Sequence, residues 1–398
     1  MRSANAVEVA RGIIASHPNT ETARPTRVSL VNESSRTIRA SDGDLAYQRG
    51  ILPGVSRTFA LTIPVLPDAL AVVMTNAYLL CRIADTIEDD PGLASEQKSR
   101  FHERFVAVVK GTHAADHFAR DLAPLLSARI LPAEQDLVRN TPAVIRVTHG
   151  FSDEERAALT RCVAIMCRGM PEFQRNKSLR GLEDLDELAE YCYYVAGVVG
   201  EMCTELFCLY CPELAAKREV MLRLAVSFGQ GLQMTNILKD IWDDRQSGAC
   251  WLPRSVFARG ALDLERLEAW HTQPVFRDGL HELIGVGHAH LRNALEYTCL
   301  IPKRETGIRR FCLWAIGLAV LTLRNIYRNP AFRSGNEVKV SRRTVKATVL
   351  TTNLTLMSNR ALKLMFARAA DGLPLAAEAV ASAARPTARP RSGRVDVV

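Results

Sequence analysis

The chain has 398 residues, of which 47% are hydrophobic and 24% charged, and its formal net charge is +8. This composition indicates a globular protein with a large core, in one large domain or two closely packed ones. The sequence has no regular alternation of basic and aromatic residues and no zinc-finger spacing, which argues against a nucleic-acid-binding protein.

In chain order, residues 1–45 are polar and mixed, and they predict a loosely ordered leader. From there to residue 370, apolar residues recur mostly at helical spacing, and alternating strand patterns are scarce. Residues 371–398 are rich in Ala, Pro and Arg, which is typical of a disordered tail. We therefore predict an all-α protein with a single domain over residues 46–370.

The cysteines and apolar runs indicate a cytoplasmic protein. Most of the ten cysteines lie in apolar, helix-like runs, where a free thiol behaves as a small hydrophobic group. The N-terminus lacks a secretory apolar segment. The runs Ala69–Cys81 and Leu313–Leu323 are too short to cross a bilayer and predict buried helices. We expect contact with a membrane surface at most, without a transmembrane anchor.

The stretch YLLCRIADTIEDD, residues 78–90, places acids at the end of an almost uncharged run. On a helix, Tyr78, Arg82, Asp85 and Asp89 follow one another by three or four residues and share one face, with Glu88 beside them. A structural salt bridge of Arg82 and a core position for Tyr78 are the alternative interpretation.

A second stretch, QMTNILKDIWDD, repeats the pattern at residues 233–244. If the helix is continuous, Gln233, Asn236, Asp240 and Asp244 lie on one face, with Asp243 next to it. Asn236 could instead be a hydrogen-bonded buried amide. Two facing sets of carboxylates repel each other unless cations lie between them, and Mg²⁺ bound to a diphosphate is the natural candidate.

The histidines give a weaker metal signal. His281, His288 and His290 lie at helical spacing, but no acids accompany them to complete a ligand set. We expect them at solvated helix positions.

These motifs, in this order, resemble those of the squalene/phytoene synthases, and within that family the squalene synthases. The matching segments are SRTFA at 56–60, the two acidic motifs, MCRGMPEF at 166–173, YCYYVAGVVGEM at 191–202 and VKVSRRTVKA at 338–347. The resemblance covers residues 50–350. It implies a single-domain isoprenoid synthase helical bundle around a central apolar cavity.

The resemblance also implies an activity, namely the head-to-head condensation of two farnesyl diphosphates to presqualene diphosphate, followed by NADPH-dependent reduction to squalene. Mg²⁺ would be held by the acids of the two motifs, which are Asp85, Glu88, Asp89, Asp240, Asp243 and Asp244. Ser56, Arg57 and Arg82 match residues that contact diphosphate.

Further roles rest on the same resemblance. Tyr191 matches a tyrosine that handles protons or stabilises cations, although core packing explains it equally well from the residues alone. Tyr78 is a second catalytic candidate. Phe59, Val195 and Gln233 are candidates for the substrate pocket, which must exclude water from carbocations.

The cofactor prediction depends on a basic loop. Lys339, Ser341 and Arg342 match a segment that closes over NADPH, and Asn236 matches a residue on the cofactor side. A run of charges like this one is more often simply solvated. The sequence also departs from the family at Ala249, where an arginine is common.

Three alternatives stay open. An enzyme of the same fold could stop at presqualene diphosphate, or make dehydrosqualene or phytoene, without reduction. A terpene cyclase would ionise a single diphosphate. A non-catalytic isoprenoid-binding assembly factor would lose its metal carboxylates, whereas this chain has both sets. We expect a monomer.

Overall fold

A computed structural model gives the fold, and it describes residues 41–376 except for 57, 259 and 261. Within these residues no strand forms, and β pairing is confined to one isolated bridge between Leu182 and Pro253. The protein is therefore all-α, as the sequence predicts.

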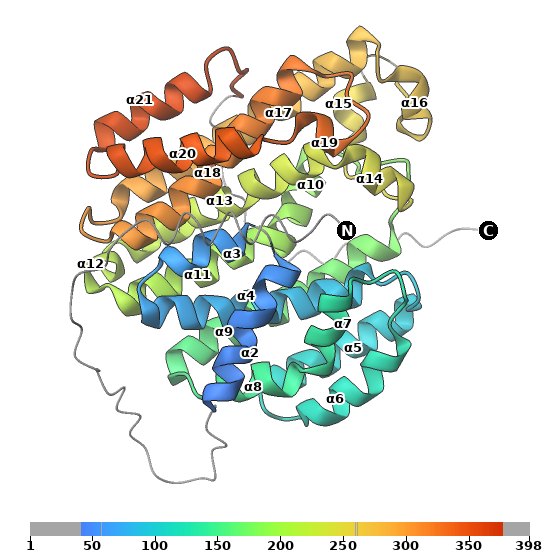
Figure 1. Cartoon of the computed structure of the whole chain (residues 1–398). Helices are drawn as coiled ribbons and strands as arrows, with labels where there is room; N and C mark the ends of the chain where they lie inside the picture. The colour runs from blue at the N-terminus through green and yellow to red at the C-terminus, as the bar shows by residue number, and fades with distance from the viewer. Residues whose placement is uncertain (1–40, 57, 259, 261, 377–398) are drawn as a thin grey trace.

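The N-terminal helices form the lower half of the molecule in Figure 1, and the C-terminal helices form the upper half. The first helices are α2 (Asp42–Val55), α3 (Phe59–Thr62), α4 (Asp68–Asp89), α5 (Ser95–Val109), α6 (Ala115–Leu122), α7 (Pro132–Arg139), α8 (Thr141–His149) and α9 (Asp153–Arg175). The next are α10 (Leu185–Cys192), α11 (Val198–Tyr210), α12 (Pro212–Ala215), α13 (Arg218–Lys239), α14 (Ile241–Gln246), α15 (Arg254–Ala258) and α16 (Leu267–Trp270). The last are α17 (Pro274–Leu300), α18 (Thr306–Arg328), α19 (Gly335–Val338), α20 (Arg342–Thr355) and α21 (Asn359–Ala369).

Helix α13 runs through the centre of the bundle and packs most extensively against α17 and α11. Two glycines allow this close packing. A Cβ on Gly229 would stand 2.2 Å from the carbonyl oxygen of Ala196, and a Cβ on Gly200 would stand 2.3 Å from that of Ala225. Between α10 and α11 the chain forms a π-helical turn, Tyr193–Gly197, which keeps the two helices in one continuous rod. Such turns are frequent at functional sites.

The core consists of two hydrophobic clusters. The first includes the apolar face of α4 together with α5, α9 and α11. The second includes the C-terminal end of α13 together with α17 and α18. The two acidic motifs therefore lie on helices that belong mainly to different clusters.

Three helical stretches are long and apolar enough to cross a membrane: Asp68–Asp89, Leu185–Tyr210 and Thr306–Arg328. Our expectation that the first and last of these are too short was wrong, because each helix extends past its apolar run into flanking polar residues. In the protein, 72%, 56% and 67% of the respective apolar windows are buried. Contacts with other helices therefore cover most of each window.

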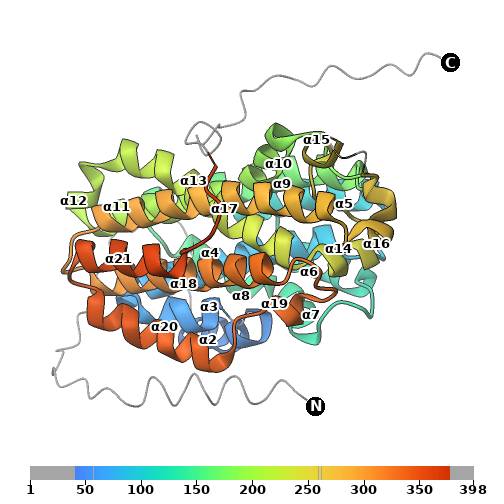
Figure 2. The ribbon, with the colours of Figure 1, turned by 90° about the horizontal axis from the view of Figure 1, so that it is seen from above.

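Helices α20 and α21 form a hairpin that packs on α18, as Figure 2 shows. Arg309, which is completely buried, holds the closed end of this hairpin. Its guanidinium donates to the carbonyl oxygens of Leu356, Thr298 and Ile301 and to Oδ1 of Asn359. Because two of these carbonyls are at or near the C-terminus of α17, the cation also meets the negative end of that helix.

The expectation that the histidines of α17 are solvated was wrong for two of the three. His290 is buried and hydrogen-bonds Oγ of Ser227 at 2.8 Å. His288 is buried and hydrogen-bonds the carbonyl oxygen of Pro374 at 2.8 Å. The reason is that neighbouring elements cover α17 on several sides, including residues 374–376, which fall in the predicted tail.

Candidate active site

The first acidic motif occupies the last two turns of α4. Along this helix the apolar side faces the core, so the carboxylates emerge at the edge of the first hydrophobic cluster. Glu88 is buried, Asp85 is half-buried, and solvent reaches Asp89. All three line one pocket.

The second acidic motif lies at a break between two helices. Our assumption of a continuous helix was wrong, because α13 ends at Lys239 and α14 begins after Asp240, whose φ is −102° and ψ 14°. An amide-to-carbonyl bond of 2.9 Å from Asp244 to Asp240 still spans the break. Asp240 and Asp244 consequently line the same pocket as the first motif, whereas Asp243 is exposed and does not line it.

The shared pocket, which we call the carboxylate pocket, has a volume of about 240 Å³. Its lining comes from α4, α9, α10, the π-helical turn, α13, α14 and the segment after α14. The lining residues are Asp85, Glu88, Asp89, Met170, Gln174, Lys177, Tyr191, Val195, Gln233, Asn236, Ile237, Asp240, Asp244, Ser247, Ala249 and Trp251.

The carboxyl groups of the carboxylate pocket hold their protons more tightly than free carboxyl groups do. Burial raises the pKa of Asp85 to about 7, and the nearby Asp89 adds to the shift. Burial likewise raises the pKa of Glu88 to about 7. The pKa of Asp244 rises to about 7 through burial first, and then through the charges of Asp240 and Asp89. The two motifs therefore feel each other electrostatically, and the pocket favours bound cations.

The donor set fits Mg²⁺ only together with a further oxygen ligand. Both carboxylate oxygens of Glu88 are buried without a hydrogen-bond partner, and Oε2 lies 3.6 Å from Nδ1 of the buried His102. Within the described residues, however, no three Asp, Glu, His or Cys side chains converge closely enough to coordinate an ion by themselves. Mg²⁺ is commonly held by one or two carboxylates plus phosphate oxygens, which matches this arrangement.

The other polar residues predicted on α4 are already paired. Arg82 forms an ion pair with Glu134, a buried residue of α7 that the sequence motifs do not reveal. Tyr78 donates from its hydroxyl to the carbonyl oxygen of Val55 at 2.9 Å. Arg82 still influences the pocket, because its charge partly offsets the rise that desolvation gives to the pKa values of Asp85 and Asp89.

The predicted substrate residues near the N-terminus lie outside the lining of the carboxylate pocket. Oγ of Ser56 accepts from the amide of Phe59 at 3.0 Å. The ring of Phe59 packs 4.9 Å from that of Tyr78 and 6.3 Å from that of Phe311, measured between centroids. Arg57 lies outside the described residues.

Tyr191 lines the pocket and stacks on Trp251, with ring centroids 4.3 Å apart and an interplanar angle of 10°. Burial raises the pKa of its phenol well above the usual range, and the charges of Asp89 and Asp244 add to this. The phenol is therefore protonated at neutral pH. Val195, Gln233 and Asn236 line the pocket with it, from the π-helical turn and α13.

The predicted cofactor loop approaches the second motif without lining the pocket. Lys339, Ser341 and Arg342 connect α19 to the start of α20, where Oγ of Ser341 accepts from the amide of Thr344 as a helix cap. Helix α19 packs against α14. A Cβ on Gly335 would stand 3.0 Å from Oδ1 of Asp240, which shows how closely this segment approaches the acids.

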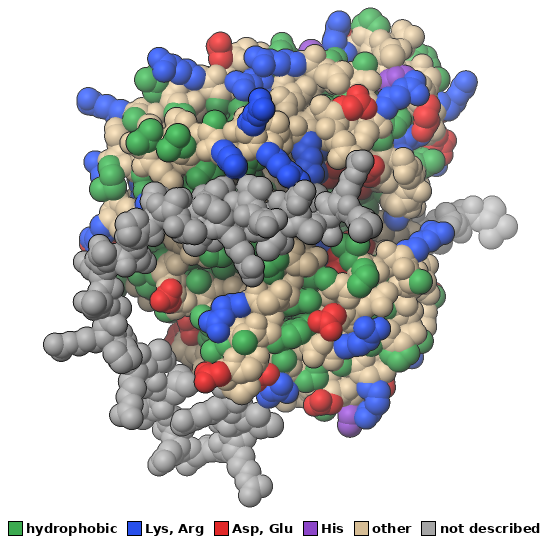
Figure 3. All heavy atoms as spheres, viewed as in Figure 1, with side chains coloured by type: hydrophobic (Ala, Val, Ile, Leu, Met, Phe, Trp, Pro, Cys, Tyr) green, Lys and Arg blue, Asp and Glu red, His purple; other side chains and the backbone are tan. Residues whose placement is uncertain are grey.

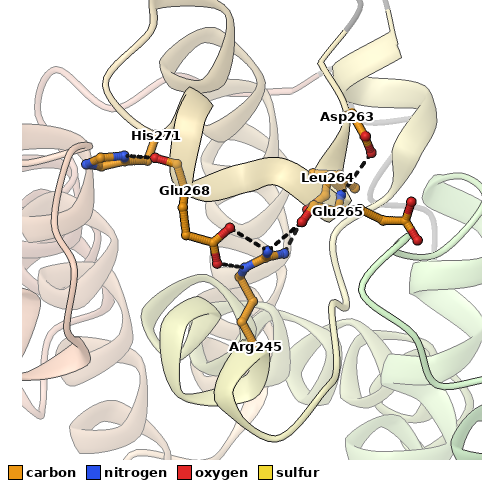
Figure 4. Close-up of polar contacts among 6 residues, drawn as sticks. All are labelled: Arg245, Asp263, Leu264, Glu265, Glu268 and His271. Atoms are coloured by element: carbon orange, nitrogen blue, oxygen red, sulfur yellow. Dashed lines mark hydrogen bonds and ion pairs between the residues drawn. The ribbon is translucent and has the colours of Figure 1, made fainter.

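Figure 4 shows Arg245, the residue directly after the second motif, turned toward the segment 264–268. Its guanidinium binds Glu268 through two bonds of 3.0 and 2.9 Å, and the carbonyl oxygens of Leu264 and Glu265 at 2.7 and 3.0 Å. Arg245 thus anchors α14 and does not line the pocket. At the position where an arginine is common in the similar family, Ala249 contributes only a methyl group.

A larger pocket of about 770 Å³ lies on the other side of the π-helical turn, between α9, α11 and α13. Its charged side chains are largely paired with one another, as in the ion pairs of Arg161 and Arg218 with Glu205. Neither acidic motif lines it, so we place the candidate active site in the smaller pocket.

Comparison with known proteins identifies the family. Residues 52–344 match the family model for squalene/phytoene synthase. The chain belongs to the squalene/phytoene synthase family. The match includes both acidic motifs and every described side chain predicted for the site.

Relatives of this squalene/phytoene synthase family member include squalene synthases. One from Gibberella zeae is 28% identical over 72% of this chain, and one from Botryococcus braunii is 27% identical over 76%. The chain spans only 59% and 63% of the lengths of these two proteins.

Solved structures share the fold. The complex of TcSQS with the ligand E5700 has a TM-score of 0.66 at 22% identity, covering 86% of this chain and 96% of its own. A dehydrosqualene synthase in complex with ligand has a TM-score of 0.60 at 21% identity, covering 79% and 97%. These likenesses confirm the predicted isoprenoid synthase fold.

Sequence reasoning missed several lining residues of the site. Gln174 lies in the last turn of α9, and Lys177 follows that helix. Ser247 and Trp251 lie after the second motif. None of them shares a helical period with the acids. The sequence signal that was available is the nearness of Gln174 and Lys177 to the MCRGMPEF segment.

Proposed function

We propose that this chain is a Mg²⁺-dependent squalene synthase that joins two farnesyl diphosphates and reduces the product with NADPH. The observation that carries the proposal is the carboxylate pocket, which is lined by acids from two separate acidic motifs. The family match and the squalene synthases among the relatives support the substrate class.

In the first half-reaction, the C1–O bond of one farnesyl diphosphate breaks and diphosphate leaves. C1 then bonds to C2 and C3 of the second molecule and loses one proton, which closes the cyclopropane of presqualene diphosphate. Bound Mg²⁺ would neutralise the charge that develops on the departing diphosphate. Asp85, Asp89, Asp240 and Asp244 would hold the metal from both sides, and Lys177 would add a hydrogen-bond donor for phosphate oxygens.

Tyr191 is our candidate for the group that accepts the proton lost from C1. Because its phenol is protonated, it can transfer its own proton to an oxygen of the released diphosphate as its oxygen takes the proton lost from C1, so that the phenol is neutral before and after the step. The stacked Trp251 fixes the ring and shields developing cations from water.

In the second half-reaction, presqualene diphosphate loses its diphosphate, its carbon skeleton rearranges, and a hydride completes squalene. NADPH would supply this hydride when bound. Asn236 lines the pocket on the side of the second motif, and the loop with Lys339, Ser341 and Arg342 follows α19, which packs against α14. We assign this loop to the cofactor as part of the proposal.

A second candidate function is the same condensation without reduction, giving presqualene diphosphate or a dehydrogenated product. The observation that favours it is that none of the three loop residues lines the carboxylate pocket. Ala249 also leaves the pocket without a guanidinium from that position.

Product analysis with farnesyl diphosphate and Mg²⁺, with and without NADPH, separates the two. Squalene formed only with NADPH would support both half-reactions. Presqualene diphosphate or dehydrosqualene in both reactions would support the second candidate. If neither reaction contains a prenyl product, longer prenyl diphosphates are tested next. The absence of a product from these substrates as well would contradict prenyl transfer.

A further inference from the structure

The hairpin of α20 and α21 has an unusual charge distribution. Residues 338–370 contain no Asp or Glu, whereas their basic residues are Lys339, Arg342, Arg343, Lys346, Arg360, Lys363 and Arg368. Lys363 forms an ion pair with Glu296 of α17. Among the described residues, no carboxylate pairs with Arg343, Lys346 or Arg360, and all three are exposed. The acids that border this range along the chain are Glu337 before it and Asp371 after it.

The same hairpin exposes large apolar side chains. The exposed fractions are 62% for Leu350, 80% for Leu354, 56% for Met357 and 55% for Leu364. These four belong to the last turns of α20, the connection and the first turns of α21, so they gather toward the closed end of the hairpin. Figure 3 shows hydrophobic side chains over this part of the surface, with lysine and arginine around them.

The exposed positions follow helical spacing. Lys346, Leu350 and Leu354 are four residues apart and share one stripe of α20. The opposite side of α20 is buried through Val349 and Thr352, which pack toward the bundle. The outward leucines therefore add nothing to the core, and an apolar group of this kind in a basic surround marks a binding surface.

We propose that this surface docks onto an anionic lipid membrane. It consists of Arg343, Lys346, Leu350, Leu354, Met357, Arg360, Leu364 and Arg368, and we call it the hairpin face. The leucines and Met357 would enter the boundary between headgroups and acyl chains, and the basic side chains would bind lipid phosphates.

Charge and side-chain type favour lipid over other partners. The centres of protein interfaces are depleted in lysine, whereas here Lys346 stands next to the leucines in one stripe. Single-stranded nucleic acid is bound through stacked aromatic side chains, and the hairpin face has none. Aliphatic tips surrounded by lysine and arginine match an anionic bilayer.

Co-sedimentation of the full chain with vesicles tests the proposal. One set of vesicles contains only phosphatidylcholine, and the other contains phosphatidylglycerol as well. We expect binding to the second set, weakened by salt, and at least a tenfold lower partition for the variant L350S/L354S/M357S. The variant R343Q/K346Q/R360Q should lose the preference for anionic vesicles.

The matched control is L125S/L131S, which removes two exposed leucines from the opposite half of the molecule, at 42% and 54% exposure. It should bind like the unchanged chain. Helical circular dichroism and thermal unfolding confirm that each variant is folded. Arg342 is left unchanged because it belongs to the proposed cofactor loop. The assay needs no turnover, so its failure would leave the proposed enzyme activity untouched.

Two outcomes would overturn the proposal. One is vesicle binding that is absent, or equal for the unchanged chain and L350S/L354S/M357S. The other is a dimer in light scattering that the same serine substitutions convert to a monomer, since the hairpin face would then bind a second copy of the chain.

Discussion

At the scale of single residues, the carboxylate pocket holds five carboxylates and the amino group of Lys177. Lys177 is half-buried, and its charge partly offsets the rise that desolvation gives to the pKa values of Glu88, Asp89 and Asp244. A lysine in this position cannot replace the metal, because its single positive charge offsets only one of the several negative charges in the pocket. It can, however, donate to a phosphate oxygen that reaches the pocket.

We predict that Lys177→Gln raises KM for farnesyl diphosphate about tenfold, since a charge-assisted hydrogen bond contributes about 1.5–3 kcal/mol. Steady-state kinetics measures the effect. Arg180→Gln is the control, because it removes the same charge three residues away on an exposed side chain that does not line the pocket. Equal changes in both variants would mean that only the overall charge matters.

Tyr191 combines two roles that substitution can separate. We predict that Tyr191→Phe keeps the stack on Trp251, changes the free energy of unfolding by less than about 1 kcal/mol, and lowers kcat at least about 100-fold, as expected for loss of a proton-transfer group. Single-turnover kinetics and thermal unfolding measure the two effects. Full activity in this variant would mean that Tyr191 contributes only packing and takes no part in proton transfer.

The sequence predicted the residues that repeat along a helix and missed those that converge only in three dimensions. Asp85 and Asp89 follow from spacing of four on α4, and the structure places both in the pocket. Lys177, Trp251 and Glu134 come from other segments, and none of them shares a helical period with the acids. Asp243 shows the reverse case, because adjacency in sequence placed it next to the acidic face and the helix break leaves it outside the pocket.

At the scale of elements, long apolar helices are predictable and their interruptions are not. The apolar run Ala69–Cys81 predicts a buried helix, and α4 contains this run and spans Asp68–Asp89. The break at Asp240 lies where α14 packs against α19, and the π-helical turn packs against α13, contacts that local propensity does not encode. Helix α2 begins at Asp42, inside the predicted leader, because Ser41 and Asp44 form a capping box.

The start of α2 offers a pH-dependent test. Asp44 is buried and binds Arg146 of α8 through bonds of 3.0 and 2.5 Å, and this lowers the pKa of its carboxyl to about 2. Because the folded pKa lies below the unfolded one, the stabilisation is complete above about pH 4 and is lost as the pH falls toward 2. Arg146 is partly exposed, so we expect about 1–2 kcal/mol.

We therefore predict that Asp44→Asn lowers the free energy of unfolding by this amount at pH 7, and that the difference from the unchanged chain shrinks below pH 4. Denaturant unfolding at several pH values measures it. Asp278→Asn is the control, since Asp278 is exposed and paired only with its neighbour Arg277. A difference that stays constant down to pH 2 would contradict the pairing.

At the scale of the whole molecule, the carboxylate pocket lies between the two hydrophobic clusters. Asp85 and Asp89 extend from a helix of the first cluster, and Asp240 and Asp244 follow a helix end of the second. The acids also repel each other across this junction, because the charge of Asp89 adds to the rise that burial and Asp240 give to the pKa of Asp244. A ligand that carries metal ions would convert the repulsion into a bridge between the clusters.

This geometry predicts that Mg²⁺ and inorganic diphosphate stabilise the protein together and not singly. A ligand at 100 times its Kd adds about 2.7 kcal/mol, which for a chain of this size raises Tm by about 3 °C. Thermal unfolding with each component alone and with both measures the effect. Asp244→Asn should abolish the joint shift, whereas Asp243→Asn should keep it, because Asp243 is exposed and outside the pocket. Since both variants remove one negative charge from α14, equal shifts would show that the two motifs do not clamp a common ligand.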